Sequence, residues 1–131
     1  MAPRPQAVLV EGPPAPTGPF PHATVVGDLV YTSGQAGRDR ETGEMGDAAA
    51  QVAQALQNLD DILHGAGSCL QSAVKVTLFL RDDVTGDDMA ALNAAYAEAF
   101  PERRPSRSSV FVSRLKNPDM LVEIEVIALV G

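Results

Sequence analysis

The sequence has few of the residues from which metal sites and disulfide frameworks are built. It contains one cysteine and two histidines among its 131 residues. The single cysteine, Cys69, excludes an internal disulfide and a zinc site that needs several cysteines. His22 and His64 lie far apart in the chain and show no metal-ligand spacing. We therefore expect no metal centre.

Long apolar runs and targeting signals are also missing. Wholly apolar runs, such as residues 127–130, are far too short to span a bilayer. Residues 1–5 contain no apolar signal stretch. The sequence therefore predicts a soluble, cytoplasmic protein without a membrane partner.

Positive charge is scarce as well. Ten Lys and Arg residues stand against 17 Asp and Glu residues, so the formal net charge is −7 at pH 7. The longest basic run is the pair Arg103 and Arg104, and an acidic chain repels phosphate backbones. Nucleic acid is therefore not an expected partner. The composition, 45% apolar and 21% charged, and the chain length indicate one globular domain over residues 1–131.

The spacing of apolar residues predicts the helices and strands. Period-two and β-branched segments predict strands at residues 7–10, 23–26, 29–32, 73–80, 107–113 and 120–130. A helical stripe begins after Asp47, a good N-cap, and ends at Gly65. A second helix begins with Thr85 and Asp88, which resemble a capping box, and ends at Pro101.

This order, β-ββ-α-β-α-β-β, predicts a two-layer α+β domain with two helices on one face of a mixed sheet. The opposite face of the sheet is then uncovered. By strand alternation it carries Phe79 and Phe111 together with the charged Lys75 and Glu123. A half-apolar uncovered face in so small a chain indicates burial against another copy of the same chain.

Several kinds of catalytic site are absent from the sequence. Neither histidine lies beside a strained serine elbow, so no Ser-His-Asp arrangement is indicated. The segment Gly34-Gln35-Ala36-Gly37 lacks the strand–GxGxxG–helix context of a dinucleotide site, and there is no P-loop. We therefore expect chemistry that needs no metal and no cofactor, which implies an intrinsically easy reaction.

Arg107 is the most informative charged residue. It begins a predicted strand on the face that also shows Ser109, and a planar guanidinium there is suited to bidentate capture of a carboxylate. Two alternatives stay open: an ordinary exposed arginine, or a structural ion pair with Glu123 or Glu125.

Glu123 and Glu125 share one face of the last strand, where they can position a water or accept a proton beside the arginine. Alternatively, they pair with basic residues such as Lys75 or solvate the surface. Asn93 lies in the second helix. Because asparagine is a poor helix former, its presence there indicates a specific hydrogen bond.

Several motifs follow one another in an order that resembles the Rid/YjgF family of enamine and imine deaminases. They are Gly18-Pro19-Phe20, Tyr31-Thr32-Ser33-Gly34-Gln35, Leu92-Asn93-Ala94-Ala95-Tyr96, Pro105-Ser106-Arg107-Ser108 and Val122-Glu123-Ile124-Glu125. The resemblance covers residues 7–130. It implies a chorismate-mutase-like subunit, a homotrimer with sites in the clefts between subunits, and hydrolysis of 2-imino or enamino acids to 2-keto acids and ammonia.

The resemblance also implies roles for individual residues. Arg107 would hold the substrate carboxylate, and Glu123 would assist the attacking water. Ser33, Gly34 and Asn93 would line the cleft. Two further lining positions depart from the family pattern, because Phe20 stands where tyrosine is frequent and Ser109 where many members carry cysteine.

Two other functions remain open on the same scaffold. One is a pathway-specific hydrolase, such as a deaminase of aminomuconate-type compounds, which the departures at Phe20 and Ser109 motivate. The other is a non-catalytic module that binds 2-keto acids through the same arginine. The family is also labelled with ribonuclease activity, for which an acidic chain without a basic aromatic stripe gives little support.

Overall fold

The computed structural model describes residues 3–131 and has the predicted order of elements. Every expected helix and strand is present, with ends that differ by a few residues. The elements are β1 (Gln6–Val8), β2 (Ala23–Val26), β3 (Leu29–Thr32), α1 (Ala48–Gly65), the short 3-10 helix η1 (Leu70–Ser72), β4 (Ala73–Arg81), α2 (Gly86–Ala99), β5 (Ser106–Val112) and β6 (Val122–Leu129).

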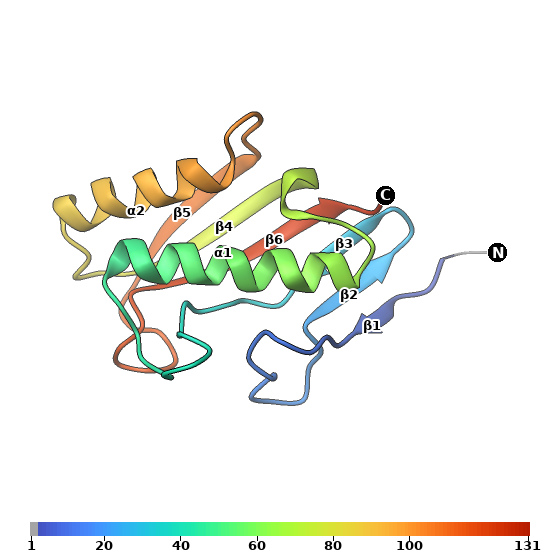
Figure 1. Ribbon diagram of the computed structural model, residues 1–131, viewed down its shortest axis with the longest axis horizontal. Coiled ribbons are helices and arrows are strands. Elements are labelled where there is room, and N and C mark those ends of the chain that lie inside the picture. The colour runs from blue at the N-terminus through green and yellow to red at the C-terminus, as the bar shows by residue number, and fades with distance from the viewer. Residues whose placement is uncertain (1–2) are drawn as a thin grey trace.

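All six strands form one sheet in the order β1-β2-β3-β6-β4-β5. Neighbouring strands are antiparallel except β4 and β5, which are parallel and connected through α2. Both helices lie on the same face of the sheet (Figure 1), with α2 toward the β5 edge. The two-layer α+β fold with a mixed sheet is therefore confirmed. No helix within residues 3–131 is long and apolar enough to cross a membrane.

Local sequence signals explain the turns and helix ends. Gly27 has a φ of 57° in the turn that joins β2 to β3, a conformation that favours glycine. Asp47 caps α1 by accepting a hydrogen bond from the backbone N–H of Ala50 at 2.9 Å. Thr85 and Asp88 form the expected reciprocal capping box at the start of α2.

The core lies between the helices and the covered face of the sheet. The apolar stripe of α1 packs on this face, α2 adds Leu92 and Tyr96, and the C-cap residue of α2 adds Phe100. Fully buried members of the core include Val52, Leu59, Ile62, Leu63, Val76, Leu78, Leu80, Leu92, Val122 and Ile124. Burial of these side chains supplies the main driving force for the fold.

The strand register decides which residues share a face. Phe79 pairs with Glu123, so both lie on the uncovered face, as predicted. Leu80 is buried and pairs with Phe111, so Phe111 belongs to the helix-covered face. The prediction that Phe111 lies on the uncovered face is therefore wrong. Phe111 is nevertheless 60% exposed, because it sits on the edge strand.

Candidate functional site

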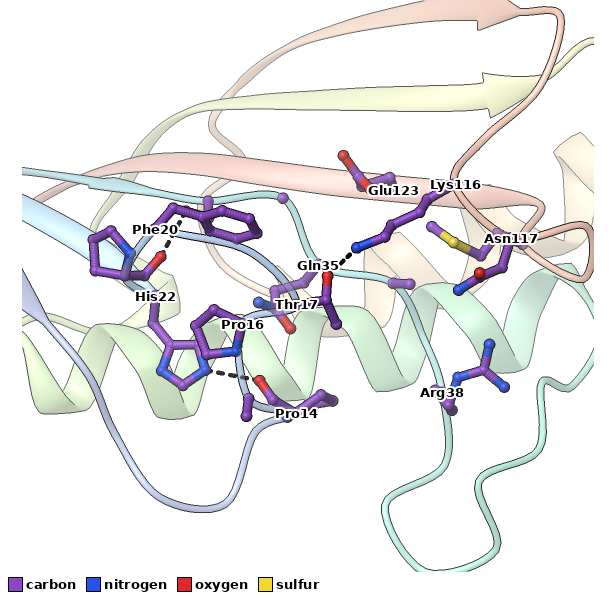
Figure 2. Close-up of a pocket in the computed structure, with 16 residues that line it drawn as sticks. Pro14, Pro16, Thr17, Phe20, His22, Gln35, Arg38, Lys116, Asn117 and Glu123 are labelled. Carbon is purple, nitrogen blue, oxygen red and sulfur yellow. Dashed lines mark hydrogen bonds between the residues drawn. The ribbon is translucent and has the colours of Figure 1, made fainter.

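An open cleft lies where three loops meet the start of β6 (Figure 2). The loops are the proline-rich segment before β2, the segment after β3 and the turn before β6. The cleft has a volume of about 140 Å³. Four of the predicted site residues line it: Phe20, Ser33, Gly34 and Glu123.

His22 and Ser33 fix the proline-rich wall of this cleft. The buried His22 ring accepts a hydrogen bond from Val10 N–H at Nδ1 (3.1 Å) and donates from Nε2 to the Pro14 carbonyl (2.8 Å). The Ser33 hydroxyl donates to the Pro21 carbonyl at 2.8 Å. These bonds use both ring nitrogens and the hydroxyl proton. His22 and Ser33 are therefore scaffolding for the wall as well as part of its lining.

Glu123 and Gly34 are in direct contact. Backbone hydrogen bonds in both directions join Gln35 and Ile124, which brings the segment after β3 against β6. A Cβ atom added to Gly34 would lie 2.4 Å from Glu123 Oε2. Only glycine leaves the carboxylate in its present position. Both residues were predicted from the sequence, but their contact depends on the backbone hydrogen bonds between Gln35 and Ile124.

The environment of Glu123 favours a proton on its carboxylate. Burial raises the pKa of Glu123 above its ordinary value, and the nearby charge of Glu125 raises it further. The Lys116 ammonium lowers this pKa, but has the smallest effect of the three. A carboxyl in a cleft with a raised pKa is suited to accept and return protons.

Sequence reasoning missed Lys116, Arg38 and Asn117, which also line the cleft. Lys116 donates a hydrogen bond to the Thr17 hydroxyl across the cleft. Arg38 forms an ion pair with Asp119 at 3.2 Å. Their position in irregular loops gives no periodic signal. The only available clue was that Lys116 lies a few residues before the strand that carries Glu123.

Gln51 holds the turn before β6 against α1. This fully buried side chain donates to the carbonyls of Gly46 (2.9 Å) and Asp119 (3.1 Å) and accepts from Leu121 N–H (2.8 Å). A buried amide with three partners fixes the backbone that it bonds. Gln51 thereby positions the loop that carries Lys116 and the start of β6.

Arg107 lies on the opposite face of the sheet from Glu123. It pairs with the buried Val76 of β4, and its guanidinium lies 4.8 Å from the ring centre of Tyr96 on α2. The expectation that Glu123 and Glu125 lie beside this arginine is therefore wrong for a single chain. Among residues 3–131, no carboxylate comes within ion-pair distance of Arg107, so the alternative of a structural ion pair is not met within one chain.

The Tyr96 ring lies against the Arg107 guanidinium. Its ring is buried, and its hydroxyl has no hydrogen-bond partner within the described part of the chain. Burial raises the pKa of Tyr96, while the charges of Arg107 and Arg104 lower it. The neutral ring therefore presents its face to the guanidinium, an arrangement that favours a cation.

The two remaining predicted residues are on the Arg107 side of the molecule. Asn93 precedes Tyr96 by one helical turn and is exposed, with no side-chain hydrogen bond to residues 3–131. The specific hydrogen bond that was expected of Asn93 is therefore not made within residues 3–131. Ser109 follows Arg107 on the same face of β5 and is also exposed. The seven predicted residues thus form two separate groups in one chain.

No group of three or more His, Cys, Asp or Glu side chains in the described residues is arranged to hold a metal ion. The chemically distinctive features are instead one half-buried carboxylate in a cleft and one guanidinium that lies over a buried tyrosine ring. A guanidinium binds carboxylates bidentately, and a carboxylate with a raised pKa transfers protons. Each group supplies half of what hydrolysis of an anionic substrate requires.

Known proteins resemble this chain over nearly its full length. It is 41% identical over 125 residues to a RutC family protein of Pyrococcus horikoshii, covering 94% of this chain and 96% of that protein. It is 40% identical over 125 residues to the 3-aminoacrylate deaminase RutC of Acinetobacter baylyi, with the same coverages. Identity to the 2-iminobutanoate/2-iminopropanoate deaminase of Escherichia coli is 38% over 127 residues, again covering 94% and 96%.

The fold comparison agrees with these relatives. The crystal structure of the YjgF gene product of Escherichia coli superposes with a TM-score of 0.83 at 34% identity, covering 95% of this chain and 98% of that chain. The family described as Endoribonuclease L-PSP matches residues 11–130. The chain therefore belongs to the endoribonuclease L-PSP family, which is the Rid/YjgF family.

Proposed function

We propose that this protein hydrolyses 2-imino and enamino acids to 2-keto acids and ammonia. The observation that carries the proposal is the pair of unpartnered groups, the Glu123 carboxylate in its cleft and the Arg107 guanidinium above Tyr96. One relative is named for deamination of 2-imino acids and another for deamination of 3-aminoacrylate, an enamino acid, and both names support the reaction class. Imines also hydrolyse spontaneously in water, so the reaction needs no cofactor.

Arg107 would bind the substrate carboxylate through its two parallel N–H donors. Water then adds to the imine carbon, while Glu123 accepts a proton from the water and returns it to the nitrogen. The resulting carbinolamine then transfers its hydroxyl proton to the amine nitrogen, and the C–N bond breaks to give the keto group and ammonia. One imino acid and one water thus give one keto acid and one ammonia. Holding the imino acid and the water in position lowers the activation free energy by roughly several kcal/mol.

We propose further that Arg107 and Glu123 act together across an interface between copies in a homotrimer. In one chain they lie on opposite faces of the sheet, so a second copy is needed to bring them together. The edge strand β5 supports such an interface, because Val110 is 42% exposed and Phe111 is 60% exposed. Asn93 and Ser109 would enter the cleft with Arg107, opposite Phe20, Ser33 and Gly34.

The decay of imino acids tests the proposed reaction. An L-amino-acid oxidase generates imino acids in situ, and semicarbazide traps those that remain. The wild type is expected to suppress trapping, whereas Arg107→Ala should lose at least about a hundredfold in kcat/KM because the carboxylate clamp is gone. Arg104→Ala, which removes a neighbouring exposed guanidinium, is the matched control. Equal trapping with wild type and with buffer, for small and large side chains, would contradict the proposal.

A further inference from the structure

Of the Lys and Arg side chains that line the cleft, Arg38 forms an ion pair within the described residues and Lys116 does not. Arg38 is neutralised by Asp119 and also donates to the Gly43 carbonyl at 2.7 Å. Lys116 has no carboxylate within ion-pair distance among residues 3–131, although Glu123 lines the same cleft. One ammonium group therefore faces the cleft without an anionic partner.

The Lys116 side chain is directed into the cleft. Figure 2 shows it reaching from the turn before β6 toward Thr17, on the side of the cleft away from Phe20. Its ammonium donates to the Thr17 hydroxyl, which is a neutral acceptor. Since an ammonium group has three donors, further N–H groups stay available to a ligand. The Asn117 side chain lines the cleft beside it.

The position of Lys116 in the cleft indicates which part of the substrate it contacts. The reacting carbon must lie near Glu123, and the carboxylate next to that carbon belongs to Arg107 in the proposed mechanism. Lys116 is then left for the far end of the substrate side chain. A negative group there would meet the ammonium of Lys116 and the donors of Thr17 and Asn117.

We propose that the cleft selects imino acids whose side chain ends in a second carboxylate, which Lys116 holds. This inference rests on the proposed function, because it deepens the substrate class of the same site. It rests on residues of this chain outside the predicted set, namely Lys116, its hydrogen-bond acceptor Thr17, and Asn117, which lines the same cleft.

A simpler role for Lys116 is to offset the charge of Glu123. The two roles differ in what they discriminate. A counter-ion of Glu123 acts alike on every substrate and product. A ligand for the second carboxylate acts only on compounds that have one. The deciding quantity is therefore a ratio of affinities between two compounds with equal carbon chains.

The keto acid products supply that pair. We would measure binding of 2-oxoglutarate and of 2-oxopentanoate to the full-length protein by calorimetric titration. The selectivity is the Kd of 2-oxopentanoate divided by that of 2-oxoglutarate. Loss of one charge-assisted hydrogen bond in Lys116→Met should lower this selectivity about tenfold. Lys116→Arg, which keeps the charge, should retain most of it.

Arg114→Met is the matched control, because it removes an exposed positive charge two residues away that does not line the cleft. Its selectivity should equal that of the wild type. Equal affinity of the wild type for the two keto acids would overturn this inference and leave imine hydrolysis standing. An unchanged selectivity in Lys116→Met would also overturn it. If neither keto acid binds, the proposed site itself fails.

Discussion

Glu123 is a carboxylate whose ionised form the fold makes costly. Burial and the charge of Glu125 raise its pKa in the folded protein above the ordinary value of 4.5. The folded state therefore binds the proton more tightly than the unfolded state does. Stability falls as pH rises through the interval between the ordinary and the raised pKa. This cost is absent below pH 4.5 and fully present above the raised pKa.

Glu123→Gln should consequently stabilise the protein while it abolishes activity. Glutamine has a similar shape but cannot ionise, so the neutral form favoured by the cleft becomes permanent. We expect the melting temperature at pH 7 to rise by about 1–3 °C and the advantage to vanish in acid. Activity should fall at least about a hundredfold, since the proton acceptor is lost. A destabilised variant at pH 7 would refute the assignment of a costly charge to this position.

The same raised pKa predicts the pH dependence of catalysis. Glu123 accepts a proton only when it is ionised, so kcat/KM should fall as the pH drops through its folded-state pKa. We expect this acid limb above pH 4.5, the ordinary glutamate value. The amount of imine that semicarbazide traps gives the rate of hydrolysis at each pH, after subtraction of the uncatalysed decay. An acid limb at or below the ordinary value would argue against Glu123 as the proton acceptor.

Gly34 matters because it leaves room for the Glu123 carboxylate. In Gly34→Ala the new Cβ would lie 2.4 Å from Oε2, so the carboxylate must move. Since this is the free end of a flexible side chain, the free energy of unfolding should change by less than about 1 kcal/mol. Displacing a proton acceptor by about 1 Å costs on the order of a hundredfold in rate. Full activity in this variant, measured beside its melting temperature, would show that the position of the carboxylate is unimportant.

At the scale of elements, the close approach of the loop after β3 to α1 is a structural requirement. A Cβ on Gly37 would lie 2.0 Å from the Gln51 carbonyl oxygen and 2.4 Å from its Cα. Backbone cannot yield as a side chain does, so Gly37→Ala should cost about 2–3 kcal/mol in the free energy of unfolding. Urea denaturation measures this change.

The matched control is Gly86→Ala, at the first residue of α2. Its Cβ would meet nothing within 4 Å, and Gly86 does not need a positive φ. This variant should be neutral or slightly stabilised, because alanine restricts the unfolded chain. If both variants have the stability of the wild type, the contact between the loop and α1 does not constrain the fold.

The elements themselves follow closely from local sequence signals. The glycine turn at Gly27, the Asp47 cap and the Thr85–Asp88 capping box are local devices, and each lies where it was predicted. Faces of strands depend on neighbours instead. Phe111 was misplaced because its face follows from its register with Leu80, which alternation along β5 alone does not reveal.

At the scale of the whole molecule, the sequence identifies the family and four residues of the cleft lining, but not the arrangement of the site. Arg107 and Glu123 are separated by β4, whose register directs them to opposite faces. Lys116 was missed because its loop has no period, and only Gln51 and the fold bring it to the cleft. These relationships are tertiary, so residue patterns cannot contain them.

The central claim is that a working site joins Arg107 of one copy to Glu123 of another. Mixing the two inactive variants Arg107→Ala and Glu123→Gln tests it directly. In an equimolar, randomly assembled mixture, each site receives an intact Arg107 in half of cases and an intact Glu123 in half. About one quarter of wild-type activity should therefore return, whatever the number of copies in a closed ring.

The measurement is imine hydrolysis by the co-expressed variants, purified through the same tag on both chains so that the whole random mixture is kept, and compared with each variant alone. Wild-type protein treated in the same way sets the scale. Recovery of about a quarter of its activity is the result that this account predicts. A mixed assembly no more active than either variant alone, while the wild type is active, would contradict a site shared between copies.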